Sequence, residues 1–449
     1  MLTQGLDRTV WTLSRRSRGL TNRANPSLPN PAARRDGASL LGNLVLMNFS
    51  ASHAVLQSCL DSRLLAGVSA LVLKNGEVVD RICIGKANLD TGEALRPDHI
   101  YRAYSSTKLI TSVMVLKLLD EGHFGLGDPI KRWIPEFGRV RVMRADPGAP
   151  SLRRVDVLED LQHDISIRHL LSHQAGLSHG VFDPGTPIFK AYHAAGVRLP
   201  SSSLAELMPM LAALPLLYQP GLGWEYSMAT DVLARLVEIV TGQTYGEALR
   251  TRLFEPLGMV DTAHLLRPDQ MARFVPLYRG DDLAQPVLPG LHPFPDVPWP
   301  DAFLKPVARQ AGSSGLVITQ ADYLRLLRQL QPGKPGFLKP ATLAEMLRDQ
   351  LPAERSLQFS PDGLMAHIAP KLPFHMGFGL GGAVTRTCSP LQPNSLPGEF
   401  QWGGLAGTHW CISPANGVTI VLMAQRHFSF WHPFWFDYKA AVYAATNPT

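Results

Sequence analysis

The sequence predicts an α+β fold, in which an antiparallel sheet is flanked by helices and carries a mostly helical insert. Strand-like segments occur near the start of the chain, at residues 67–85, and return only from residue 378 onward. Between them, apolar side chains recur mainly at helical spacing. Strands at both ends with helices between them favour a sheet built from the two ends of the chain.

The individual elements follow from local patterns. Two apolar runs flank Asn75-Gly76, a pair that accepts positive φ at both turn positions and predicts a hairpin. Further strands are expected at residues 378–384, 400–403, 409–412 and 418–423. Apolar spacing predicts helices over residues 50–64, 105–120, 167–171, 203–214, 230–240, 245–253, 320–330 and 434–446.

The composition is that of a globular protein. Of the 449 residues, 45% are apolar and 18% charged, enough for a sizeable core without disulfides or metals. The chain also contains 38 glycines and 37 prolines, which predict long ordered loops. Residues 286–306 hold seven prolines and should form such a loop, because proline lacks the N–H donor that helices and sheets use.

The positive charge is concentrated at the N-terminus. The formal net charge is +6, and residues 1–46 contribute +5 through seven arginines against two aspartates. The rest of the chain is therefore nearly neutral, which argues against a nucleic-acid-binding face. We expect residues 1–46 to be a disordered extension. An organelle transit peptide, or a translation start at Met47, would also explain this segment.

The remaining compositional features favour a cytoplasmic protein. No apolar run approaches the roughly 18 residues of a membrane span, and the arginine-rich start lacks the apolar stretch of a secretory signal. The four cysteines show no C-x-x-C spacing, so neither a disulfide framework nor a cysteine zinc site is expected. Reduced thiols are typical of the cytoplasm.

The first candidate for chemistry is an S-x-x-K pair, Ser105 and Lys108, at the start of a predicted helix. Residues three apart share a helical face, so the amine can reach the hydroxyl. A serine hydroxyl needs an adjacent base, and lysine can serve when burial or a nearby cation lowers its pKa. Taken alone, the pattern more often marks an N-capping serine followed by a solvated lysine.

Two later segments are also candidates. Tyr226 lies in a turn before a predicted helix, and a phenol is a plausible base beside a cation. Trp402-Gly403-Gly404 places two glycines in a predicted strand, where another group can approach the backbone and an edge strand would offer free N–H groups. Taken singly, a core tyrosine and a glycine-rich bend are the commoner explanations.

Together the three motifs resemble those of the serine β-lactamase and penicillin-binding-protein superfamily. S-x-x-K is followed about 120 residues later by the tyrosine, and W-G-G lies near the C-terminus. The resemblance covers about residues 50–445 and points to the class C-like branch, in particular to the family VIII carboxylesterases and related statin-side-chain acyltransferases. Connecting sequence agrees at residues 121–130, 167–177, 256–259 and 312–316.

The resemblance implies a β-lactamase-like catalytic domain at residues 47–449. Residues 47–120 and 307–449 would form its α/β part, and residues 121–306 the helical insert. Ser105 would be the nucleophile, Lys108 and Tyr226 would share the role of general base, and the backbone N–H groups of Ser105 and Leu405 would bind the oxyanion. No metal or organic cofactor is implied. The residues expected to contact substrate are Trp402, Gly403, Gly404 and His409.

Two departures from the β-lactamase pattern favour ester chemistry. Met228 stands where the pattern has Asn, and Trp402-Gly403-Gly404 replaces Lys-[Ser/Thr]-Gly. The missing Asn and Lys remove a donor and a positive charge that grip the amide and carboxylate of a β-lactam or peptide. We therefore expect hydrolysis of small, mainly short-chain carboxylic esters, with a small-molecule ester as the partner.

Several alternatives remain open. The same serine, lysine and tyrosine would serve an acyltransferase, and weak β-lactamase or D-peptidase activity is a third possibility. A non-catalytic binding or scaffold protein on this fold is the rival from another class. For His409 the alternative is a hydrogen-bonded structural role, which we also assign to His173 and His179. The aromatic residues in 428–436 should pack the C-terminal helix on the sheet, and loop 286–306 should wall the cleft.

Overall fold

The computed structural model describes residues 47–146, 149–295, 302–333, 336–359, 365 and 375–446. These residues belong to one compact unit, Met47–Thr449. The expected disordered extension at residues 1–46 and part of the proline-rich loop, residues 296–301, lie outside the described residues. In the described ranges, every helix is too short or too polar to cross a membrane.

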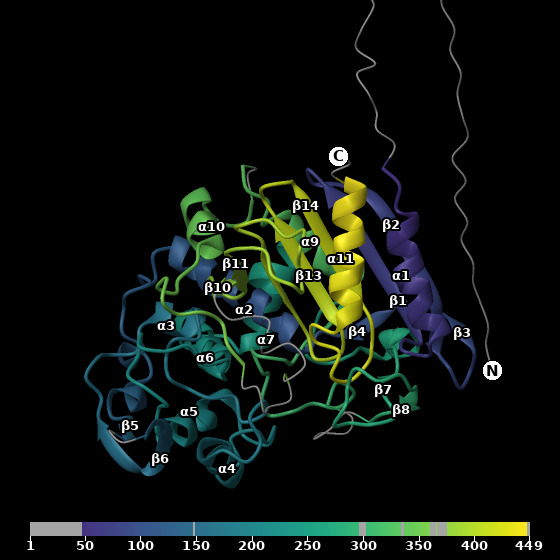
Figure 1. The fold of residues 1–449 in the computed structure, drawn as a ribbon. Helices are drawn as coiled ribbons and strands as arrows, with labels where there is room; N and C mark the ends of the chain where they lie inside the picture. Colours follow the sequence, from purple (N-terminus) through teal and green to yellow (C-terminus); the bar gives the residue numbers. More distant parts are fainter. Residues whose placement is uncertain are drawn as a thin grey trace, which may run out of the picture. The chain divides into compact units, whose positions relative to one another are not determined.

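An eight-stranded antiparallel sheet lies at the centre of this unit (Figure 1). Its strands are β1 (Gly67–Lys74), β2 (Glu77–Asn88), β3 (Glu93–Ala94), β10 (Met376–Phe378), β11 (Ala383–Thr385), β12 (Phe400–Gly403), β13 (Thr408–Ser413) and β14 (Val418–Met423). Their order is β10-β11-β12-β13-β14-β1-β2-β3. The two ends of the chain therefore meet at the β1–β14 pair, where Ala70 lies opposite Leu422. This confirms the sheet expected from the sequence.

Helices cover both faces of the sheet. The helices α1 (Ser50–Asp61) and α11 (Pro433–Thr446), from opposite ends of the described chain, lie side by side on one face (Figure 1). On the other face, α9 (Gln320–Arg328) contacts β14. The 3₁₀ turn η1 (Tyr104–Ser106) contacts β12 and β13 there, and it leads directly into α2 (Thr107–Asp120).

Helix α2 is enclosed on nearly all sides, and even its polar residues Thr107, Lys108, Thr111 and Ser112 are buried. A layer of helices packs against it through α6 (Ala229–Thr241), which in turn contacts α3 (Ile167–Leu171), α5 (Leu204–Ala212) and α7 (Tyr245–Leu249). The start of α2 thus lies between the sheet and the start of α6, which brings the S-x-x-K pair close to the segment that carries Tyr226.

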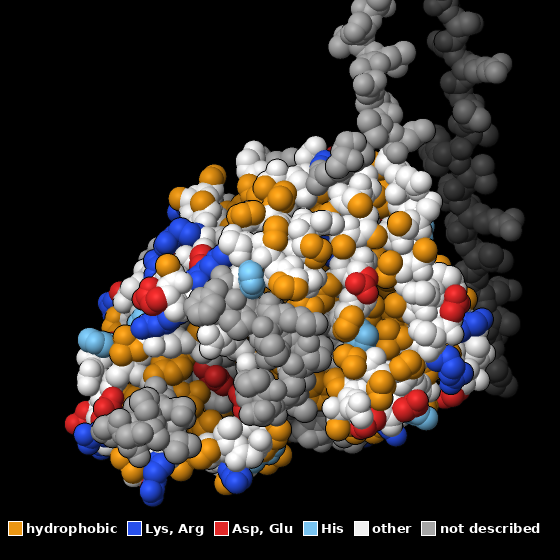
Figure 2. Space-filling view, viewed as in Figure 1, with side chains coloured by type: hydrophobic (Ala, Val, Ile, Leu, Met, Phe, Trp, Pro, Cys, Tyr) orange, Lys and Arg blue, Asp and Glu red, His pale blue; other side chains and the backbone are white. Residues whose placement is uncertain are grey.

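The remaining elements surround this core. They are α4 (Pro187–Ala194), α8 (Glu255–Leu257) and α10 (Pro340–Leu347), and the turns η2 (Ile130–Arg132), η3 (Pro135–Gly138), η4 (Arg250–Phe254) and η5 (Pro268–Arg273). Three strand pairs complete the fold: β4 (Ile100–Arg102) with β9 (Val317–Thr319), β5 (Arg141–Asp146) with β6 (Ala149–Asp160), and β7 (Tyr278–Arg279) with β8 (His292–Pro293). On the face shown in Figure 2, Lys and Arg side chains are interspersed with Asp and Glu.

Three local expectations need correction. Residues 378–384 form no single strand, because Gly379 donates to the Gly382 carbonyl at 2.8 Å and Gly381 has φ 109°, which folds the segment into the β10–β11 hairpin. The helix expected at residues 245–253 changes after α7 into the π-helical turn η4. The β5–β6 ribbon has no counterpart among the expected elements, because its many charged residues obscure the apolar alternation of a strand.

Candidate active site

Ser105 lies in η1, a turn that the surrounding backbone holds tightly. Tyr104 before it has φ 43°, a left-handed conformation that is strained for a residue other than glycine. The Ser106 hydroxyl donates to the Thr408 carbonyl at 2.7 Å, and the Thr408 hydroxyl donates to the Ala103 carbonyl at 2.9 Å. These bonds fix the turn against β13.

Lys108 follows Ser105 by one helical turn. Its Nζ donates to Ser105 Oγ at 3.4 Å and to the Ser313 carbonyl at 2.9 Å. Burial lowers the pKa of Lys108 to about 7; the positive charge of Arg198 lowers it further, and the negative charge of Asp231 acts in the opposite direction. A substantial fraction of this amine is therefore unprotonated at neutral pH, as a general base must be.

Tyr226, in the loop before α6, joins the pair from the helical layer. Lys108 Nζ lies 4.5 Å from the centroid of the Tyr226 ring, and Trp402 Nε1 donates to Tyr226 Oη at 3.3 Å. Burial raises the pKa of Tyr226, while hydrogen bonds with Ser105 and Trp402 lower it. Desolvation dominates, so the phenol keeps its proton at neutral pH.

Two histidines lie against the Tyr226 ring. The His179 ring stacks on it at 5.3 Å with an interplanar angle of 5°, and the His173 ring is 4.9 Å away. Ser227 hydrogen-bonds to His173 Nδ1 through its hydroxyl at 2.8 Å. Burial and the charge of Lys108 hold the pKa of both histidines well below its usual range, so both rings are neutral. No sequence pattern predicts these contacts, because both histidines lie outside the regular helices and strands.

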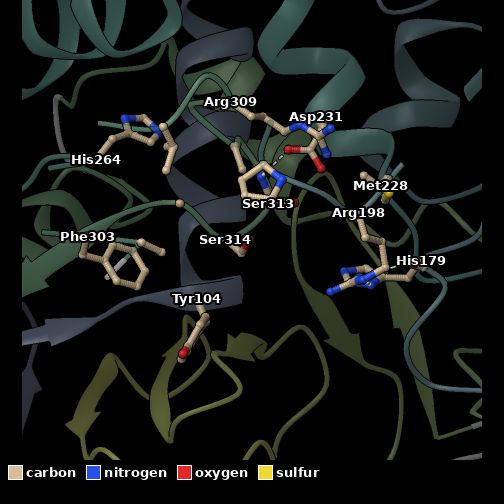
Figure 3. Close-up of a pocket in the computed structure, with 15 residues that line it drawn as sticks. Tyr104, His179, Arg198, Met228, Asp231, His264, Phe303, Arg309, Ser313 and Ser314 are labelled. Atoms are coloured by element: carbon tan, nitrogen blue, oxygen red, sulfur yellow. Dashed lines mark hydrogen bonds between the residues drawn. The ribbon is translucent and has the colours of Figure 1, made fainter. Parts of the chain in front are cut away.

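Two cavities adjoin these residues. The smaller, with about 230 Å³ of empty space, is lined by Ser105, Phe182, Tyr226, Phe359, Trp402, Leu405 and Phe430. The larger has about 810 Å³, part of it open to solvent (Figure 3). Tyr104 and Ser313 line the larger cavity, which places it next to Ser105 and Lys108. Ala302 and Phe303 form part of its wall, so the described end of the proline-rich loop reaches the cleft.

The Beta-lactamase family matches residues 53–441. The chain belongs to the Beta-lactamase family. Esterase EstB of Burkholderia gladioli is 30% identical over 428 residues, which cover 93% of this chain and 99% of that protein. Lovastatin esterase of Penicillium rubens is 28% identical over 393 residues, covering 81% and 92%. The solved structure of EstCE1, a hydrolase with promiscuous acyltransferase activity, has a TM-score of 0.70 at 24% identity and covers 87% of this chain and 97% of that one.

These findings confirm the resemblance and the β-lactamase-like α+β fold. Met228, which stands where the β-lactamase pattern has Asn, lines the larger cavity and gives it an apolar side chain in place of an amide. In the described part of the chain, no group of three or more His, Cys, Asp or Glu side chains is placed to hold a metal ion.

The structure brings most of the candidate residues together, but not His409. Ser105, Tyr226, Trp402 and Leu405 line one cavity, and Lys108 contacts Ser105. His409 is fully buried, stacks on Trp435 at 4.9 Å, and accepts a hydrogen bond from the Trp431 amide at 3.0 Å. These contacts support the structural alternative for His409, and its contact with substrate stays a prediction.

Gly403 and Gly404 are not among the described residues that line the two cavities. A Cβ on Gly404 would lie 2.2 Å from the Ala103 carbonyl oxygen, and one on Gly403 would lie 2.8 Å from the His409 ring. Both glycines therefore allow close packing. β12 is also no edge strand at Phe400, which pairs with β11 on one side and with β13 on the other.

The aromatic walls of the smaller cavity come from segments that the sequence analysis did not assign to the site. Phe182 and Phe359 lie in loops without apolar periodicity, and their rings are 6.0 Å apart. Phe430, expected only to pack the C-terminal helix, lies 5.0 Å from Trp402 and lines the cavity. The site is therefore more enclosed by aromatic rings than its three motifs indicate.

Proposed function

We propose that the protein is a serine carboxylesterase that cleaves short-chain esters through an acyl-enzyme. The observation that carries this proposal is the contact between Ser105 Oγ and Nζ of the buried Lys108, whose pKa is about 7. Such a pair supplies a nucleophile and an adjacent base. The two esterases among the similar proteins support ester hydrolysis.

In the proposed reaction, Lys108 takes the proton from Ser105 Oγ as the oxygen attacks the ester carbonyl. The backbone N–H groups of Ser105 and Leu405, which line the same cavity, would hold the resulting oxyanion. The Tyr226 phenol then donates its proton to the departing alcohol and regains one from the Lys108 ammonium. In the second half, Tyr226 passes its proton to Lys108 and takes one from the water that attacks the acyl-serine, and Lys108 returns its proton to Ser105 Oγ as the acid leaves. Lys108 and Tyr226 thus share the role of general base.

The two cavities suggest how the ester is placed. The smaller one contains Ser105 and Leu405, and we place the acyl group there, against Phe182, Phe359 and Phe430. The alcohol part would then occupy the larger cavity. This arrangement explains the expected preference for short acyl chains by steric exclusion.

Finer assignments belong to the same proposal. The S-x-x-K pair and W-G-G support membership of the family VIII branch, and buried free thiols at Cys59 and Cys411 support a cytoplasmic location. We also retain the division into an α/β part at residues 47–120 and 307–449 and a helical insert at residues 121–306. No cofactor takes part in the proposed reaction.

Labelling with a fluorophosphonate tests the proposal directly. Wild-type protein should be labelled at Ser105 and should hydrolyse nitrophenyl acetate and butyrate, whereas Ser105→Ala should do neither. Ser201→Ala, which changes an exposed serine, is the matched control and should behave as wild type. Absence of label on wild type, or undiminished label on Ser105→Ala, would reject the proposal that the protein is a serine esterase.

Acyl transfer is the second candidate function. The same Ser105, Lys108 and Tyr226 would serve it, and the similar EstCE1 is a hydrolase with promiscuous acyltransferase activity. Turnover of a nitrophenyl ester with added alcohols decides between the two: faster formation of new ester than of free acid favours the transferase. Nitrocefin hydrolysis as fast as that of simple esters would instead favour a β-lactamase.

A further inference from the structure

The larger cavity is mostly apolar but contains one guanidinium with unused donors. Pro200, Met228 and Phe303 contribute apolar walls. Arg198, which follows α4, projects from the wall opposite Phe303 and lies beside His179 (Figure 3). A cation in such surroundings is poorly solvated, and an anion that bonds to it recovers the lost solvation.

The hydrogen bonds of Arg198 leave most of the N–H donors of its guanidinium free. Its Nη1 contacts His179 Nδ1 at 3.0 Å and donates to the His179 carbonyl at 3.1 Å. Within the described part of the chain, Nη1 is the only nitrogen of this guanidinium with a protein partner. Arg309, which lines the same cavity, differs, because its Nε, Nη1 and Nη2 donate to Ser202 and Val197. Arg198 is therefore held in place, but its guanidinium still has N–H donors available for a ligand.

The charges around the cavity also favour an anion. Asp231 is the only Asp or Glu among the described lining residues, and its carboxylate accepts a hydrogen bond from the Ser313 amide at 3.1 Å. Arg198 and Arg309 face it with two positive charges. Burial lowers the pKa of His264 to about 4 and keeps that of His179 well below its usual range, so neither histidine adds charge near neutral pH.

Resting on the esterase function above, we propose that the larger cavity holds the alcohol part of the ester and that Arg198 binds a carboxylate on it. The substrate class is a short-chain acyl ester of a hydroxy acid. The guanidinium fork matches a carboxylate geometrically and can donate two parallel hydrogen bonds. Arg198 thus supplies, from the helical layer, a positive charge that the third motif lacks.

The test compares two acetate esters of equal size. One is the ester of ω-hydroxyhexanoate and the other that of ω-hydroxyhexanamide, with butanoate and octanoate homologues to cover the reach of the cavity. Charge-assisted hydrogen bonds predict that wild-type kcat/KM is about 10- to 100-fold higher for at least one acid than for its amide. Assays run at about pH 9, where Lys108 is unprotonated, so that loss of the Arg198 charge does not act through the base.

Variants locate the effect. Arg198→Gln should remove the preference for the acid, and Arg198→Lys should keep part of it. Arg328→Gln, which changes an exposed arginine on α9, is the matched control and should retain it. Adipate should also inhibit the wild type more strongly than adipamide, a comparison that does not depend on the folding of any variant.

Two outcomes overturn the inference. One is equal turnover of acid and amide by wild type at every chain length, with no stronger inhibition by adipate. The other is a preference that survives in well-folded Arg198→Gln. In either case, the esterase proposal still stands as long as Ser105 is labelled and neutral esters are turned over. Failure of the esterase itself would appear as loss of both the label and the turnover of neutral esters.

Discussion

At the scale of single residues, Lys108 is an amine whose protonated form is disfavoured by its surroundings. It is buried, and no carboxylate among the described residues lies within ion-pair distance of it. Its Nζ has the Ser313 carbonyl and the Ser105 hydroxyl as partners. An amine placed in this way accepts a proton near neutral pH, whereas an exposed lysine does so only near pH 10.

The pH profile should show this directly. Because Lys108 must be unprotonated to accept the Ser105 proton and its pKa is about 7, kcat/KM for nitrophenyl butyrate should rise with pH through about 7 and then level off. Lys108→Ala should reduce kcat by about 10²- to 10⁴-fold. Lys117→Ala, on the same helix but paired with Glu121, should retain the wild-type profile. A rise centred near pH 10 would contradict the assignment of Lys108 as the base.

Trp402 offers a second test at this scale. Its indole donates to Tyr226 Oη at 3.3 Å, a bond that orients the phenol and stabilises charge on its oxygen. Trp402→Phe keeps an aromatic ring but removes the donor, so kcat should fall about 2- to 12-fold with little change in KM, as expected for loss of one hydrogen bond.

Trp410→Phe is the matched control for this substitution. Trp410 lies opposite Trp402 on β13 and is equally buried, but its indole N–H has no partner among the described residues. It should keep wild-type turnover. Equal losses in the two variants would show that packing of the sheet, and not the bond to Tyr226, is responsible.

At the scale of elements, the site depends on the close approach of β12 to the turn before α2. Gly404 makes this approach possible, since a Cβ there would lie 2.2 Å from both the Ala103 carbonyl oxygen and Thr408 Oγ1. Gly404→Ala should push the strand end away from Ser105, lower kcat/KM at least about 10²-fold and destabilise the fold by about 1–3 kcal/mol.

Labelling rate and thermal melting measure the two effects separately. Gly127→Ala is the control, because a Cβ at Gly127 meets nothing within 4 Å. A Gly404→Ala protein that is labelled as fast as wild type would show that the strand end can shift without moving Leu405, and that the predicted coupling is absent.

Some helices and strands could be predicted from sequence patterns, and others could not. The Asn75-Gly76 hairpin was predictable because both residues take positive φ, at 55° and 88°, which few other pairs accept. Residues 378–384 were predicted as one strand because they are apolar, yet the glycines among them allow a turn that apolar periodicity cannot show. The β5–β6 ribbon was not predicted, because its many charged residues obscure the apolar alternation by which a strand is recognised.

At the scale of the whole molecule, the order of the motifs predicted which segments meet, but not what surrounds them. The proximity of Ser105, Lys108 and Tyr226 was predictable because the S-x-x-K pair, the tyrosine and W-G-G follow one another in the order of the β-lactamase pattern. Arg198 and Phe182 were not, because both lie in loops whose positions depend on tertiary packing. The third motif lacks the lysine of the β-lactamase pattern, and Arg198, which lines the larger cavity, would supply a positive charge in the proposed substrate binding.

Every described residue of the site lies after Met47, within the compact unit Met47–Thr449. A chain that begins at Met47 should therefore keep kcat/KM within about 2-fold. Its melting temperature should stay within a few degrees, since a larger shift would require the free energy of unfolding to change by about 1 kcal/mol or more. Its formal net charge should fall from +6 to +1, so cation-exchange retention should drop sharply while activity does not. Loss of activity or a clearly lower melting temperature in the shortened chain would show instead that residues 1–46 contribute to the folded catalytic unit.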